Sequence, residues 1–117
     1  MQPPPEQSET TLEITVQELH EMRESNLPHL LIDCRRNDEY QFCRIEGALH
    51  VPMNETWTRI GEFQSHADQP IIVYCHHGIR SLNVVQWLRQ QGLPTARSMA
   101  GGIDAWTEHI DASVPSY

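Results

Sequence analysis

Long apolar runs are absent from this sequence: no hydrophobic segment approaches the roughly 20 residues that a membrane-spanning helix needs. Its first residues contain neither the basic segment nor the apolar segment of a secretory signal peptide. Internal repeats and a sustained heptad pattern are absent as well. We therefore expect a cytoplasmic protein that is neither a membrane protein, a repeat array nor a coiled coil.

Positive charge is scarce, with 8 Lys and Arg against 16 Asp and Glu and a formal net charge of -8. A phosphate backbone or an anionic membrane surface would be repelled by this mean charge. The composition therefore argues against nucleic acid and membranes as partners, but it permits a local cationic pocket.

Cysteine is scarce too, and the three that occur, Cys34, Cys43 and Cys75, cannot all pair with one another. At least one thiol is therefore free. In a reducing compartment a single cysteine is more often buried or reactive than bridged. The cysteines thus become candidates for chemistry as well as for packing.

The 117 residues are enough for about one ordinary domain. Residues 2–10 are rich in proline and polar side chains, which is typical of a disordered segment. We predict a disordered leader over residues 1–11, a single folded domain over residues 12–108 and a C-terminal tail over residues 109–117.

Short apolar runs and amphipathic stretches alternate along the predicted domain. Thr15 and Glu18 form a capping-box pattern, which predicts a helix that runs to about Ser25. The apolar runs predict strands and the amphipathic stretches predict helices. The predicted strands are 12–14, 30–32, 48–51, 71–74 and 96–99, and the other predicted helices are 37–43, 54–64, 81–91 and one through Trp106.

Such alternation indicates an α/β fold, with a central, mostly parallel sheet of about five strands and helices on both faces. In these sheets, sites form beyond the carboxyl ends of the strands. We expect Trp57, Trp87 and Trp106 to pack in the core or between helices rather than to form a binding stripe.

The segment after the predicted strand 71–74 has the most informative chemistry. A short loop leads from Cys75 to Arg80 and into a helix. Inward-pointing loop amides and the helix dipole should together lower the pKa of the Cys75 thiol. Gly78 lets the backbone turn where a Cβ would obstruct it, and Arg80 supplies a planar cation for an oxyanion. The alternative, a buried cysteine before an ordinary loop, explains the combination less well.

Four motifs, in order, resemble those of the rhodanese-homology domain, the sulfurtransferase family. The loop Cys75-His76-His77-Gly78-Ile79-Arg80-Ser81 is similar to its Cys-x-x-Gly-x-Arg-Ser/Thr active-site loop. Residues 31–35 resemble its Asp-x-Arg strand end, residues 39–40 with 45–52 resemble its second signature, and residues 101–106 resemble its Gly-Gly-x-x-x-Trp ending. The resemblance covers about residues 12–108. Arg44 departs from it, standing where the family usually has His, and this position is outside the loop.

The resemblance implies a single-domain rhodanese-like fold and a sulfurtransferase that moves sulfane sulfur from a donor such as thiosulfate to cyanide or a thiol. Cys75 would be the catalytic nucleophile and would carry the sulfur as a persulfide between two half-reactions. No metal and no cofactor is implied, and a protein sulfur acceptor is left open. The residues implied to bind substrate in the loop are His76, His77, Gly78, Ile79, Arg80 and Ser81.

Three charged residues outside the loop are also candidates. Asp33 and Arg35 could shape the pocket electrostatically, or they could pair with each other and with the loop. We assign Asp33 to structural support and Arg35 to substrate contact. Glu39 is assigned to structural support, either in an ion pair with an arginine at the rim or as a solvated helix residue.

Histidines and the other cysteines have two interpretations each. His76 and His77 could supply a proton or a pH-dependent charge, but a thiolate needs no general base, so we expect their rings to lie in solvent. A zinc site at residues 75–77 is disfavoured because adjacent residues rarely converge on one ion. Cys34 and Cys43 are expected to be small apolar fillers rather than resolving thiols.

Two other functions stay open: a phosphatase or arsenate reductase on the same scaffold, and a non-catalytic binding or regulatory module. Four residues separate Cys75 from Arg80, one fewer than in the similar dual-specificity phosphatases. The smaller ring suits a sulfur atom better than a tetrahedral phosphate. The presence of both Cys75 and Arg80 argues against the binding module.

Overall fold

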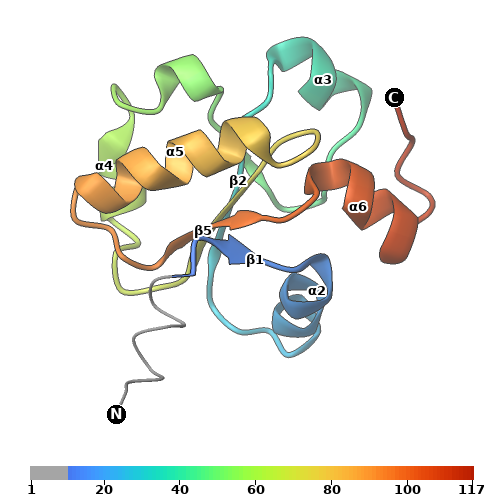
Figure 1. Cartoon of the computed structure of the whole chain (residues 1–117), viewed down its shortest axis with the longest axis horizontal. Helices are drawn as coiled ribbons and strands as arrows, with labels where there is room; N and C mark the ends of the chain where they lie inside the picture. The colour runs from blue at the N-terminus through green and yellow to red at the C-terminus, as the bar shows by residue number, and fades with distance from the viewer. Residues whose placement is uncertain (1–10) are drawn as a thin grey trace.

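Five parallel strands form the centre of the computed structural model, which describes residues 11–117 (Figure 1). Their spatial order is β1-β5-β4-β2-β3, and every pairing is parallel. The predicted α/β architecture is therefore confirmed. The predicted leader falls almost entirely on residues 1–10, outside the described residues. The strands are β1 (Glu13–Ile14), β2 (Leu30–Asp33), β3 (Leu49–His50), β4 (Ile71–Tyr74) and β5 (Ala96–Met99).

Helices pack against both faces of the sheet, as predicted (Figure 1). The short helix α4 (Ile60–Gln64) and the long helix α5 (Ile79–Gln90) cover one face, and α2 (Val16–Glu24) and α6 (Gly102–His109) cover the other. Helix α3 (Asn37–Phe42) follows β2. None of the helices within residues 11–117 has the length and apolar character that a membrane span requires.

The segment after β3 differs from the single helix predicted over residues 54–64. It forms the 3-10 helix η1 (Met53–Glu55), a series of turns, and then α4. Because the chain turns at this point, Trp57 does not share a face with Phe63, which is fully buried. Trp57 is 69% exposed, so the prediction that it packs in the core or between helices is wrong.

Two apolar cores lie on opposite sides of the sheet, because successive side chains of a strand point to opposite faces. In β4, Ile71 and Val73 join the core under α5, whereas Ile72 and Tyr74 join the core under α2 and α6. Both sides are buried, which explains why β2 and β4 are almost continuously apolar in sequence. Cys75 lies in the same core as Ile71 and Val73.

The N-terminus of α6 is fastened to the loop after β4. The amide of Ile103 donates to the carbonyl of Cys75 (2.8 Å), and the amide of Asp104 donates to the carbonyl of His76 (3.1 Å). Gly102 has a positive φ of 64°, and a Cβ there would overlap both loop carbonyls. This close approach of backbone to backbone explains the glycine.

We predict that Gly102→Ala lowers the free energy of unfolding by about 2 kcal/mol or more, because the substitution strains the backbone and displaces the loop carbonyls. Denaturant unfolding followed by circular dichroism measures the change. Gly61→Ala in α4 is the matched control, since nothing lies within 4 Å of its added Cβ. We expect it to leave stability unchanged or to raise it by up to about 1 kcal/mol. Wild-type stability in Gly102→Ala would contradict the close packing.

Candidate active site

The sulfur atom of Cys75 lies in a cradle of hydrogen-bond donors at the carboxyl end of β4. It accepts hydrogen bonds from the amides of Gly78 (3.1 Å) and Ser81 (3.3 Å) and lies 3.3 Å from the Ser81 hydroxyl. Helix α5 begins at Ile79, so the positive end of its dipole lies at the sulfur. Gly78 has a φ of 101°, a left-handed conformation that glycine adopts without strain. Here the chain forms the anion cradle that the sequence predicts.

Cys34 lies beside Cys75 on the neighbouring strand. The register pairs Asp33 with Tyr74, and the amide of Cys34 donates to the carbonyl of Tyr74 (3.0 Å), so the two cysteines are the next residues along both strands. A hydrogen bond from the Cys34 thiol is the largest contribution that lowers the pKa of Cys75 to about 4. Burial opposes this shift, and hydrogen bonds from Ser81 and Gly78 add to it.

The Cys34 thiol keeps its proton when Cys75 is a thiolate. Its hydrogen bond to Cys75 and its burial both raise the pKa of the Cys34 thiol. A protonated thiol beside a thiolate is a hydrogen-bond donor, so Cys34 does more than fill apolar space. Cys43 is buried in the other core, and all three cysteines are free.

Arg80 and Glu39 form a two-pronged ion pair at the rim of the site. The Nη1 and Nη2 atoms of Arg80 lie 2.8 and 3.0 Å from the two carboxylate oxygens of Glu39, which is 6% exposed. The amide of Arg36 also donates to this carboxylate (3.0 Å). The hydrogen bonds from Arg80 are the main cause that lowers the pKa of Glu39 to about 2, against the effect of burial. Of the two alternatives for Glu39, the ion pair is the one present.

A hollow of about 760 Å³ opens beside this ion pair. Arg80 and Cys34 line it, together with residues of the segment around η1. It is the space through which a reactant could approach the Cys75 loop. The residues that line it are Cys34, Arg36, Asn37, Pro52, Met53, Asn54, Glu55 and Arg80.

Arg35 does not reach this hollow, which corrects the prediction that it contacts the substrate. Its side chain is fully buried, and its Nη2 atom pairs with Asp33 at 2.7 Å. The same guanidinium donates to the carbonyl of Cys43 and to the Tyr117 hydroxyl (2.8 Å). A guanidinium held in this way supports the site from the protein interior. Asp33 contributes to the same support, since it also accepts a hydrogen bond from Tyr74 (2.8 Å).

Tyr117 is a residue of the site that the sequence did not indicate. Its hydroxyl donates to Glu39 (2.9 Å), and burial raises the pKa of Tyr117 to about 12, so the proton is retained. Its ring stacks on His76, with 3.8 Å between the ring centroids and 7° between the planes. His76 is therefore half-buried and not in solvent as expected, whereas His77 is exposed. No local pattern links Tyr117 to a loop so distant in sequence.

His76, His77 and Asp104 bring their potential ligand atoms within 4.8 Å of one another. The two imidazole rings are stacked, with their centroids 3.9 Å apart and 22° between their planes. Lone pairs on stacked rings run nearly parallel, whereas zinc ligands must converge on one point. One ring would have to turn before these residues could share an ion.

Comparison with known proteins gives one consistent result. A family model described as the rhodanese-like domain matches residues 15–109. Among curated proteins, the adenylyltransferase and sulfurtransferase MOCS3 of Aedes aegypti is 37% identical over 112 residues, which cover 89% of this chain and 26% of that protein. The thiosulfate sulfurtransferase GlpE of Haemophilus influenzae is 37% identical over 94 residues, which cover 80% of this chain and 86% of that protein. This chain thus spans about a quarter of the MOCS3 relative.

Solved structures are similar over most of the chain. The SSP1007 protein of Staphylococcus saprophyticus has a TM-score of 0.75 and 32% identity, covering 88% of this chain and 97% of that one. The human single-domain sulfurtransferase TSTD1 has a TM-score of 0.76 and 26% identity, covering 85% of this chain and 97% of that one.

The hydrogen bond from Cys34 predicts a specific pH dependence. The rate at which iodoacetamide alkylates Cys75 should reach half of its maximum near pH 4 in the wild type, because the pKa of Cys75 is about 4 and only the thiolate reacts. In Cys34→Ala the midpoint should move to higher pH, because a donor to the thiolate is lost. Peptide mass mapping at each pH measures the fraction modified.

Cys43→Ala is the matched control for this experiment. Cys43 is also buried but lies in the other core, so its loss should leave the Cys75 midpoint unchanged. An unchanged midpoint in Cys34→Ala would contradict the role of Cys34 as a donor.

Proposed function

This chain belongs to the rhodanese-like domain family, and from that premise we propose that it is a sulfurtransferase whose Cys75 carries a transferable sulfur atom as a persulfide. The observation that carries the proposal is the cradle of hydrogen-bond donors around the Cys75 sulfur. These donors stabilise the thiolate, which is the nucleophilic form of the side chain. The names of the relatives give independent support, since GlpE is a thiosulfate sulfurtransferase and MOCS3 is named in part as a sulfurtransferase.

The proposed reaction has two half-reactions. The Cys75 thiolate attacks the outer sulfur of a donor such as thiosulfate, so that a new S–S bond forms, the S–S bond of the donor breaks and sulfite leaves. Cyanide or a thiolate then attacks the outer sulfur of the persulfide, and the Cys75 thiolate leaves. A thiol with a pKa of about 4 is a good leaving group, so the low pKa favours the second half-reaction.

Each loop residue has a place in this proposal. The amides of Gly78 and Ser81 stabilise the anionic sulfur, and Arg80, held by Glu39, braces the rim and offers charge to an anionic donor. His76, His77 and Ile79 form the rest of the loop around the donor. The proposed chemistry requires no metal and no cofactor. We expect the protein to act in the cytoplasm.

Cys75 loading is the direct test. Incubation with thiosulfate should add one sulfur atom, about 32 Da, to the intact mass, and Cys75→Ser should abolish the addition because it removes the thiolate that holds the persulfide. Cys43→Ser is the matched control and should still take up sulfur. An unchanged wild-type mass with thiosulfate and with a persulfide donor would favour the binding module over the enzyme.

Arg80→Lys tests whether charge alone is sufficient at the rim. Lysine cannot place two parallel donors on the Glu39 carboxylate, so a charge-assisted hydrogen bond is lost. We expect kcat/KM for thiosulfate and cyanide to fall about ten-fold to hundred-fold, which corresponds to roughly 1.5 to 3 kcal/mol. Arg44→Lys, the same substitution at an exposed position outside the loop, should have no effect. Wild-type turnover in a folded Arg80→Lys protein would show that the planar fork is unnecessary.

A further inference from the structure

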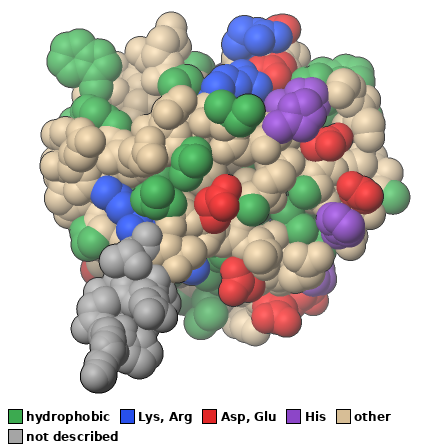
Figure 2. All heavy atoms as spheres, viewed as in Figure 1, with side chains coloured by type: hydrophobic (Ala, Val, Ile, Leu, Met, Phe, Trp, Pro, Cys, Tyr) green, Lys and Arg blue, Asp and Glu red, His purple; other side chains and the backbone are tan. Residues whose placement is uncertain are grey.

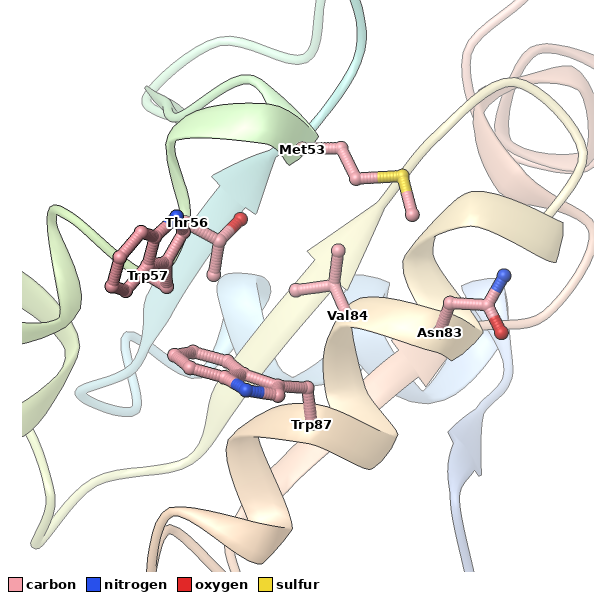
Figure 3. Close-up of a pocket in the computed structure, with 6 residues that line it drawn as sticks. All are labelled: Met53, Thr56, Trp57, Asn83, Val84 and Trp87. Carbon is pink, nitrogen blue, oxygen red and sulfur yellow. The ribbon is translucent and has the colours of Figure 1, made fainter.

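A second hollow lies beside the proposed catalytic pocket. It has a volume of about 320 Å³ and shares the side chain of Met53 with the larger hollow that contains Arg80 (Figure 3). Trp57 comes from the turns before α4, and Val84 and Trp87 come from α5, with their side chains directed toward the same space (Figure 3). This volume is at the lower end of the range for ligand pockets, roughly 300 to 1,000 Å³, and suits a group of one or two rings.

The lining of this hollow is uncharged, unlike that of its neighbour. Its residues are Met53, Thr56, Trp57, Asn83, Val84 and Trp87, whereas the catalytic pocket presents two cations, Arg36 and Arg80, and one anion, Glu55. In the space-filling view, hydrophobic side chains are exposed over α5 and the segment that leads to α4, while most acidic side chains lie over the other half of this face (Figure 2). A neutral, apolar group therefore fits the smaller hollow, and an anionic group fits the larger one.

Two features of the lining have no explanation in the packing of the fold. Trp57 is 69% exposed, although a large aromatic side chain is usually buried unless it contacts a partner. The hydroxyl of Thr56 is buried without a hydrogen-bond partner among the described residues. Ligand pockets typically combine aromatic walls with a few such polar atoms.

Helix α5 sets the distance from this hollow to the reactive sulfur. The amide of Ser81 contacts the Cys75 sulfur at 3.3 Å, and Val84 follows three residues later. At a rise of 1.5 Å per residue, the wall of the hollow begins about 5 Å further along the helix axis. Helix α5 therefore separates the hollow from the sulfur by about one helical turn, a distance that a small molecule with one ring can span.

We infer that this hollow binds the body of the sulfur acceptor and that the acceptor is an aromatic thiol whose ring carries no charge. The inference rests on the proposed function and deepens it. The ring lies between Trp57 and Trp87, and the thiolate end extends past Met53 toward Arg36 and Arg80. Its sulfur attacks the outer sulfur of the Cys75 persulfide: the new S–S bond forms, the bond to the Cys75 sulfur breaks, and its electron pair returns to the Cys75 thiolate. The product is an aromatic persulfide, and no oxidant or reductant is required.

Three acceptors test this inference with thiosulfate as the donor: 4-methylbenzenethiol, 2-mercaptoethanol and cyanide. Trp57→Ala should lower kcat/KM for 4-methylbenzenethiol roughly three-fold to ten-fold, the effect expected for loss of an aromatic contact. The values for 2-mercaptoethanol and cyanide should not change, because these acceptors are too small to fill the hollow. Leu27→Ala, which removes an exposed apolar side chain that does not line either hollow, should change none of the three. An equal loss with all three acceptors, or no loss with the aromatic thiol, would overturn the inference.

A binding measurement separates this inference from the proposed function. Methyl phenyl sulfide has the ring but no thiol, so it cannot accept sulfur. Its titration should change the tryptophan fluorescence in a saturable way, and Trp57→Ala should weaken this binding. Absence of saturable binding in the wild type would overturn the inference even if cyanide turnover stands. Saturable binding in a protein without cyanide turnover would overturn the proposed function instead and support the hollow as an aromatic site.

Discussion

A buried sulfur anion is the constraint on which most of this structure depends. The Cys75 side chain is 1% exposed, and burial by itself raises the pKa of a thiol. The thiolate can therefore exist only where enough donors converge on one atom. That requirement explains the tight loop at the start of α5, the left-handed Gly78 and the buried Ser81, whose hydroxyl lies 2.7 Å from that of Ser98 on β5.

Hydrogen-bond dipoles contribute most to stabilising this anion. The leading causes that lower the pKa of Cys75 are hydrogen bonds from the Cys34 thiol, from the Ser81 hydroxyl and from the loop amides. The hydrogen bonds of the nearby arginines go to carboxylates: Arg35 pairs with Asp33 in the interior, and Arg80 pairs with Glu39 at the rim while its charge still acts on the Cys75 sulfur. Fixed dipoles need no reorganisation when charge moves from sulfur to acceptor.

Segments that are distant in sequence hold the loop in place. The amides at the start of α6 bind its carbonyls, which is possible because Gly102 lets the two backbones meet. Tyr117 stacks on His76 from the other end of the chain and joins Arg35 to Glu39 through its hydroxyl. The loop is thus fixed on both its backbone and its side-chain surfaces, so its amides are preorganised toward the sulfur.

The sequence by itself determined the parallel α/β architecture, the positions of the strands and the cradle at Cys75, because these depend on local patterns: apolar runs, a capping box, and a cysteine followed by Gly78 and a helix start. The tertiary structure decided which side chains from distant segments lie next to the site residues. Cys34 lies beside Cys75 because β2 and β4 are adjacent in a particular register, and Arg35 is buried because Asp33 and Tyr117 meet it there. Trp57 is exposed because the chain turns before α4. Strand order and register arise from contacts between distant segments, and no local pattern contains them.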